Sequence, residues 1–175
     1  YCVMEWNATG QRTALGGDTS VIVENLQVKG DYIAWMEGYG SNSQRIAVFN
    51  RVTRTRKAFI PPFPPARIRV ANFSVAVTSG VPYVFYDAYF IDLHYSDIYR
   101  WDASSDTSVK LTGSDGYNFR PISDGTIVSW ARGTAFAFPT DPRFNDPTPL
   151  LAQPVKGGSV FQLSASAYEP AAGNG

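Results

Sequence analysis

Short runs of alternating apolar and polar residues follow one another along the chain, and each run is bounded by glycine or by a cluster of Thr, Ser, Asn and Asp. Alternation with a period of two is typical of half-buried β-strands. No stretch of about 12 residues has apolar side chains at the 3.6-residue spacing of an amphipathic helix. The pattern therefore predicts an all-β protein built from short antiparallel strands.

One pattern recurs three times at a steady interval, because the asparagines that begin its copies lie 47 and 46 residues apart. Each copy begins with Asn and a large apolar residue, reaches a glycine turn, and ends in an aromatic residue five positions past that glycine. The copies are NLQVKGDYIAW (25–35), NFSVAVTSGVPYVFY (72–86) and NFRPISDGTIVSW (118–130). The aromatic residues are Trp35, Phe85 and Trp130. We interpret each copy as two strands joined by the glycine turn.

A second pattern lies between these copies and predicts a second pair of strands. It consists of an aromatic residue followed by Asn or Asp, a polar turn rich in Thr and Ser, and another short strand. Its copies are VMEWNATGQRTAL (3–15), IAVFNRVTRTRKAFI (46–60) and IYRWDASSDTSVKL (98–111). A weaker fourth copy runs from FAF (136–138) to LLA (150–152), with the latter as the last strand of its unit.

Four antiparallel strands in about 45 residues are the signature of a β-propeller blade. A β-sandwich is the alternative, but the strands of a sandwich need not recur as a matched repeat, so the repeat favours a propeller. The repeat units lie at about 20–66, 67–116 and 117–157, with partial units at 1–17 and 158–170, in a single propeller domain of residues 1–175. The sequence leaves two arrangements of the blades possible. The partial units combine into a composite fourth blade, to which SVFQLSASAYEP (159–170) adds an inner strand, or the chain is an arc of a larger propeller.

The blade motif resembles the TolB-like family of β-propellers. The resemblance rests on "G-[DT]-x-I-x-W", followed by "I-x-x-[WF]-[ND]" and a Thr/Ser-rich turn, and covers about residues 1–152. It implies a scaffold, mostly secreted or periplasmic, that binds proteins or ligands on one face or in a central channel. It implies no fixed chemistry.

The amino-acid composition excludes several classes of protein function. Fifteen basic and fifteen acidic residues balance, which argues against binding to nucleic acid. The only cysteine is Cys2, so no intrachain disulfide is expected. No apolar run reaches the roughly 18 residues of a membrane span. Because the chain starts at Tyr1, we expect a processed form or a fragment. The resemblance to TolB-like propellers implies a secreted, extracellular or periplasmic protein.

Candidate chemistry is sparse. Asp102, Ser104 and Asp106 alternate as in a calcium loop, but the loop lacks the required glycine and glutamate, and a polar turn explains these residues better. His94 is the only histidine, so no histidine-based metal cluster or catalytic relay is expected. The glutamates do not single out a glycosidase-type pair. They are Glu5, Glu24, Glu37 and Glu169. We therefore predict no catalytic residue, no metal and no cofactor.

The segment YDAYFIDLHYSD (86–97) is the most informative for binding, because we expect it to be a long loop on the face that propellers use for partners. Exposed aromatic side chains there would contact a protein or a glycan. The candidates are Tyr86, Tyr89, Phe90, His94 and Tyr95. The alternative is that the aromatic residues pack between blades. NAT and NFS make Asn7 and Asn72 glycosylation sites if a secretory pathway uses them.

Charge is distributed unevenly along the chain. Residues 45–69 contain seven Arg or Lys and no acid, whereas residues 87–106 contain five Asp and only one Arg. Such segments could pair within the fold or attract a second copy. The sequence thus predicts a non-enzymatic extracellular scaffold that binds a protein or glycan. A self-assembling structural subunit and a fragment of a glycan-active propeller enzyme are the alternatives.

Overall fold

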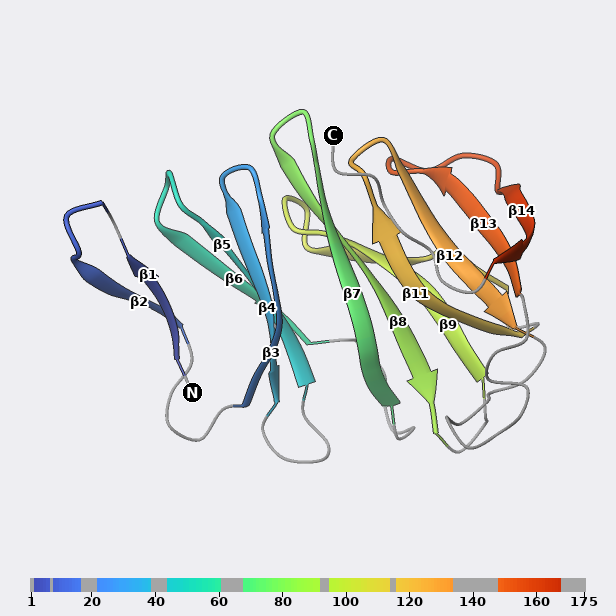
Figure 1. Ribbon diagram of the computed structural model, residues 1–175, viewed down its shortest axis with the longest axis horizontal. Coiled ribbons are helices and arrows are strands. Elements are labelled where there is room, and N and C mark those ends of the chain that lie inside the picture. The colour runs from blue at the N-terminus through green and yellow to red at the C-terminus, as the bar shows by residue number, and fades with distance from the viewer. Residues whose placement is uncertain are drawn as a thin grey trace. The chain divides into compact units, whose positions relative to one another are not determined.

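The computed structural model describes residues 2–6, 8–16, 22–38, 44–60, 68–91, 95–113, 116–133 and 148–167. The chain divides into two compact units, Tyr1–Pro64 and Pro65–Gly175, next to the predicted boundary between the repeat units 20–66 and 67–116 (Figure 1). The regular elements in the described ranges are all β-strands, as the alternation predicts. Within these ranges, no helix is long and apolar enough to cross a membrane. That residues 1–175 form a single domain stays a prediction.

Unit 1 contains a two-stranded hairpin and a four-stranded antiparallel sheet. The hairpin consists of β1 (Val3–Trp6) and β2 (Arg12–Gly16). The sheet has the order β3-β4-β5-β6, and its strands are β3 (Ile22–Lys29), β4 (Tyr32–Gly38), β5 (Gln44–Asn50) and β6 (Thr55–Phe59). Tight turns follow Lys29 and Asn50, where the glycine turn and the polar turn are predicted. This sheet is the strand pattern predicted for residues 20–66.

Unit 2 contains two groups of four antiparallel strands. The first group is β7 (Ile68–Thr78), β8 (Val81–Phe90), β9 (Tyr95–Asp102) and β10 (Thr107–Lys110). The second is β11 (Tyr117–Ser123), β12 (Ile127–Gly133), β13 (Thr148–Pro154) and β14 (Phe161–Ala167). A single parallel bridge, between Tyr117 and Ser96, joins the groups. We call them sheet β7–β10 and sheet β11–β14.

The last sheet differs from the prediction in the places of its outer strands. Residues 150–152 were expected to form the fourth strand of the third unit, and 159–170 an inner strand of a further one. In the structure β13 pairs directly with β12, as Leu151 opposite Trp130 shows, and β14 pairs with β13. LLA therefore belongs to the third strand, and β14 is the fourth strand of the same sheet. The composite closing blade that includes residues 1–17 stays a prediction. The segment 136–138 lies outside the described residues.

The polar turns after β5 and β9 have the same local structure, which confirms that the Asp102 segment is a turn. Asn50 Oδ1 accepts the backbone N–H groups of Val52 and Thr53, at 2.9 and 3.0 Å. Asp102 Oδ1 likewise accepts the N–H groups of Ser104 and Ser105, at 2.8 and 3.3 Å. Such side-chain turns are what Asn and Asp favour. Asp102 is therefore engaged by its own turn.

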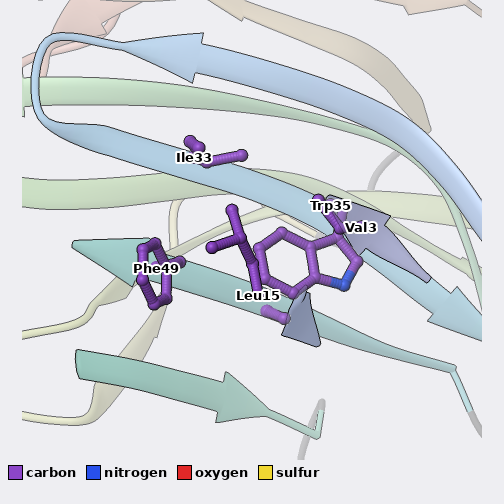
Figure 2. Close-up of a cluster of buried hydrophobic side chains, with 6 residues drawn as sticks. Val3, Leu15, Ile33, Trp35 and Phe49 are labelled. Atoms are coloured by element: carbon purple, nitrogen blue, oxygen red, sulfur yellow. The ribbon is translucent and has the colours of Figure 1, made fainter. Parts of the chain in front are cut away.

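The three aromatic residues that follow the glycine turns form the centres of the cores, and each is fully buried. In unit 1, Trp35 lies among Val3 and Leu15 of the hairpin and Ile33 and Phe49 of the sheet (Figure 2). In unit 2, a second core joins residues from both sheets. Its members are Ala76, Phe85 and Ile98 of sheet β7–β10 and Val128, Trp130 and Val155 at or next to strands of sheet β11–β14. In both units, one layer of strands thus packs face to face on the next.

A buried ion cluster joins three strands of unit 1 at the edge of the Trp35 core. Glu37 is fully buried, and its carboxylate accepts the Trp35 Nε1–H at 2.7 Å and the Arg56 Nη2–H groups at 2.7 and 2.8 Å. Arg45 Nε donates to the same carboxylate. Gly16 of the hairpin passes close by, because a Cβ there would lie 2.8 Å from Trp35 Cζ2 and 2.9 Å from Arg56 Nε. The hairpin therefore needs glycine at this crossing.

Replacing Trp35 tests the unit 1 core. We expect Trp35→Ala to lower the free energy of unfolding by about 3–5 kcal/mol, because it removes a fully buried ring from close packing. Trp6→Ala is the matched control, since Trp6 is 65% exposed. Urea titration followed by circular dichroism measures both. A loss for Trp35→Ala no larger than that for Trp6→Ala would contradict this assignment of the core.

The Glu37 cluster predicts a loss of stability in acid. Burial alone would raise the pKa of Glu37, but the hydrogen bonds from Arg56, Trp35 and Arg45 outweigh burial and hold its pKa below the ordinary 4.5. A lowered pKa contributes stability above the unfolded-state value that is lost as the pH falls through the folded-state pKa. Between about pH 6 and about pH 3.5, the wild type should therefore lose more stability than Glu37→Gln, which has no carboxyl group to titrate. Urea midpoints at each pH check this.

The exposed Glu24→Gln variant is the control for that experiment and should follow the wild type. At neutral pH, Glu37→Gln should already be less stable than either, because Arg45 and Arg56 lose their anionic partner. Parallel pH curves for the wild type and Glu37→Gln would refute the role given to the cluster.

Candidate functional site

In each four-stranded sheet the tight turns lie at one end and the longer connections at the other, which we call the loop end. In sheet β7–β10 the loop end is formed by the last residues of β8 and the first of β9. Tyr89 and Phe90 end β8, and Tyr95 begins β9. Residues 92–94 between them, including His94, lie outside the described residues. Tyr117 at the start of β11 pairs with Ser96 here. Aromatic residues therefore gather at the loop end.

Tyr86 does not belong to this end, and its predicted exposure is wrong. It lies in the middle of the ten-residue strand β8 and is fully buried. Its ring stacks on Tyr99 at a centroid distance of 5.5 Å, its hydroxyl lies 2.9 Å from Ser108 Oγ, and burial raises its pKa. The predicted loop starts too early because β8 pairs with β9 as far as Phe90 and Tyr95. Tyr86 is thus a core residue.

The remaining candidates lie on opposite faces of the sheet. Phe90 is buried and stacks on the half-buried Tyr95, at a centroid distance of 4.5 Å. Tyr89 is half-buried on the other face, where burial and then the neighbouring Tyr117 raise its pKa. Arg69 of β7 is exposed and pairs directly with Tyr89, so the two side chains share that face. The loop end therefore presents Tyr89 with Arg69 on one face and Tyr95 on the other.

Sequence reasoning missed Arg69 and Tyr117 at this site. Arg69 ends the basic run 45–69, and its place beside Tyr89 follows from strand register, which depends on a β-bulge in β7 between Val70 and Phe73. Tyr117 reaches Ser96 through a bridge between two sheets. Neither relation has a signal in the local sequence.

A buried carboxylate holds the strands behind Tyr89 together. Asp87 is 2% exposed and accepts four N–H donors. They are the backbone N–H groups of Ala71, Asn72 and Arg120, at 3.0, 2.7 and 3.1 Å, and Asn72 Nδ2–H at 2.8 Å. Burial raises the pKa of Asp87, whereas these donors favour its ionised form. The network ties β8 to the bulge of β7 and to β11, and so fixes the strand end that carries Tyr89.

The Asp87 network bears on the predicted glycosylation site at Asn72. The nitrogen to which a glycan would be attached is the one that donates to Asp87. A glycan on this nitrogen would disturb the bulge of β7. Asn7, the other candidate, lies outside the described residues.

Other buried carboxylates are also engaged within the fold. Asp97 is fully buried, with Lys110 Nζ 2.6 Å from Oδ2 and Thr112 Oγ1 donating to Oδ1 at 2.9 Å. The half-buried Glu5 also accepts hydrogen bonds, from Arg51 and Arg54 of the basic run. The described residues contain no group of three or more His, Cys, Asp or Glu placed to hold a metal ion.

Comparison with known proteins identifies the architecture. No family model and no curated protein matches the chain. The structure is similar to the β-propeller domain of the Trilobed protease from Pyrococcus furiosus, with a TM-score of 0.56 and 11% identity over 84% of this chain and 44% of that one. It is also similar to a structure from an analysis of two prolyl endopeptidases. The TM-score is 0.56, with 13% identity over 93% of this chain and 22% of that one.

TolB from Acinetobacter baumannii is matched at a TM-score of 0.49 and 15% identity, over 90% of this chain and 36% of that one. That score carries no argument about family, so the TolB-like assignment stays a prediction. The chain spans less than half the length of each of these three structures. At such low identities the comparisons show the fold alone. The architecture is a β-propeller, and strand pairing in the described residues forms separate sheets that do not close.

Asp87 provides a test of this site. We expect Asp87→Asn to lower the free energy of unfolding by about 2–4 kcal/mol, because its amide group replaces an acceptor with a donor in front of buried N–H groups. Asp124→Asn is the control, since Asp124 Oδ1 accepts the N–H groups of Thr126 and Ile127, and Asn retains that oxygen. Its change should stay within about 0.5 kcal/mol. Equal losses in urea unfolding for both variants would refute the network.

Proposed function

We propose that this chain is an arc of a β-propeller that acts as a non-enzymatic binding module and contacts a protein or glycan partner at the loop end of unit 2. The observation that carries the proposal is the pair formed by the half-buried Tyr89 and the exposed Arg69 on one face of β7 and β8. The half-buried Tyr95 extends the surface to the opposite face.

The chemistry of these side chains suits recognition. Tyrosine offers a large apolar ring and a hydroxyl while ordering few rotatable bonds, and arginine offers five N–H donors, so both are enriched in binding hot spots. A tyrosine ring can also pack against the apolar face of a sugar. Because Asp87 fixes the strands behind Tyr89, little ordering would accompany binding, and preorganisation of this kind favours affinity.

Binding is favoured over catalysis by the state of the carboxylates. Glu37, Asp87 and Asp97 are buried and engaged by cations, hydroxyls or backbone N–H groups of the same unit. Such groups stabilise the fold and are not presented to a substrate. A secreted or periplasmic location is part of the same proposal.

A second candidate is that the arc forms part of the propeller domain of a larger enzyme. It is favoured by the match to the propeller domain of a protease, which is an analogy of fold. In that case the catalytic residues would belong to another domain. The loop end of unit 2 would still be the binding surface of this part.

Alanine substitutions at the loop end test the proposed function. We expect Tyr89→Ala and Arg69→Ala each to weaken binding to the partner by about tenfold or more, as hot-spot residues do. The wild type is first applied to printed arrays of glycans and of secreted proteins, and calorimetry then gives the affinity of each variant for the strongest hit. Lys156→Ala removes an exposed cation at the tight-turn end and should bind like the wild type. Unchanged binding by correctly folded Tyr89→Ala and Arg69→Ala, or a wild type that binds nothing on either array, would overturn the proposal.

A further inference from the structure

Two buried side-chain nitrogen atoms of unit 2 have no hydrogen-bond acceptor in the described part of the chain. They are Arg100 Nε of β9 and Gln153 Nε2 of β13. Gln153 is only 4% exposed, and Arg100 is half-buried. Native proteins provide an acceptor for almost every buried donor, because a donor without one loses its hydrogen bond to water and gains nothing in return.

Both side chains project into the space between sheet β7–β10 and sheet β11–β14. Arg100 lies two residues after Ile98 on β9, and Ile98 belongs to the core between these sheets. Gln153 lies two residues after Leu151 on β13, and Leu151 packs against the same core. Residues two apart on a strand share a face of the sheet. Arg100 and Gln153 therefore approach the interface from opposite sheets.

The guanidinium group of Arg100 is held at the end of β13. Its Nη1 donates to the Val155 carbonyl at 3.0 Å. The turn after β13 passes beside it, since a Cβ at Gly157 would lie 3.5 Å from Nη1. Arg100 Cζ also lies over the ring of Tyr83, 5.5 Å from the ring centroid. Because Val155 follows Gln153 by two residues, the guanidinium and the Gln153 amide lie at the same end of the interface.

The positive charge of Arg100 has no carboxylate partner among the described residues, because the acidic residues described in unit 2 are engaged elsewhere. Asp87 accepts backbone N–H groups, Asp97 contacts Lys110, Asp106 accepts the Trp101 Nε1–H, and Asp102 and Asp124 accept the N–H groups of their own turns. A half-buried cation whose partners are one carbonyl and one ring lacks a counter-charge, which is costly away from water.

We propose that this end of the interface binds a small monovalent anion of the size of chloride, which accepts the N–H groups of Arg100 Nε and Gln153 Nε2. An anion accepts hydrogen bonds without donating any, and it also neutralises the guanidinium charge. A water molecule would satisfy the donors but leave the charge uncompensated. The ion links β9 of one sheet to β13 of the next at the tight-turn end of unit 2, so it stabilises the packing of the two sheets.

Thermal unfolding in two salts tests the site. We expect about 0.2 M sodium chloride to raise the melting temperature of the wild type by about 3 °C or more relative to sodium gluconate at the same ionic strength, because an ion that binds only the folded state stabilises it by mass action. Gluconate is too large for a site between packed sheets. Circular dichroism follows the unfolding. Equal melting temperatures in the two salts would overturn the proposal and leave water as the acceptor.

Two variants and a matched control locate the ion. Arg100→Met removes the charge and should reduce the difference between the two salts to less than about 1 °C. Gln153→Glu supplies a carboxylate beside Arg100, so it should also abolish the response to chloride and keep the melting temperature in gluconate at or above that of the wild type. Lys156→Met removes an exposed cation at the same end of unit 2 and should retain the full response. A full response in Arg100→Met or Gln153→Glu would refute the assigned position.

Chlorine nuclear magnetic resonance measures binding directly. The wild type should broaden the line of free chloride more than Arg100→Met does, because only the wild type exchanges chloride with the ordered site. Broadening that is equal in the two proteins would show an adventitious surface ion only, and the proposal would then be wrong. Failure of this proposal leaves the loop-end site untouched, because the two sites share no residue.

Discussion

The fold depends on the burial of one aromatic side chain per sheet, placed five residues after a tight glycine turn. Trp35 and Trp130 each lie in the first hairpin of a sheet and pack on the preceding layer of strands. When twisted sheets pack face to face, side chains must fill the space between them at the centre of the interface. A large aromatic ring fills this space at little cost in side-chain entropy. The turn fixes where this ring falls on the strand, since a shift by one residue would direct it to the opposite face. Interlayer packing and strand register are therefore determined together.

Features that depend on local chemistry could be predicted from the sequence, and features that depend on pairing between distant strands could not. The glycine turns, the Asn50 and Asp102 turns and the buried aromatic residues all follow from residue types at short spacing. Tyr86 was misplaced because the length of β8 is set by its two neighbours. The place of β14 was missed because a proline-rich segment interrupts the pattern before β13. At the candidate site, Tyr89 and Tyr95 were predicted because they lie in an aromatic segment expected to form a long loop, but only strand register separates their faces and brings Arg69 to one of them.

Several charged side chains of the basic and acidic runs have partners inside their own unit. The basic run 45–69 supplies Arg45 and Arg56 to Glu37, and Arg51 and Arg54 to Glu5. Among the acidic residues of 87–106, Asp87 binds backbone N–H groups and Asp97 contacts Lys110. These members of the two segments therefore have partners within their own unit. These ion pairs within a unit reduce the charge that is available for attraction between copies, which favours binding through aromatic side chains over self-assembly driven by charge.

The strands β3 and β11 each contain a β-bulge whose first extra residue is left-handed, and this conformation limits how these positions can vary during evolution. An L-residue with a Cβ pays roughly 1–2 kcal/mol for this conformation, and Asn and Gly tolerate it best. Asn25 suits the bulge of β3, whereas Arg120 occupies the same conformation in β11, where its N–H is held by Asp87. Drift at position 120 should thus run toward Asn, Asp or Gly and away from β-branched residues. The backbone conformation, rather than the chemistry of the side chain, would determine which amino acids are tolerated at this position.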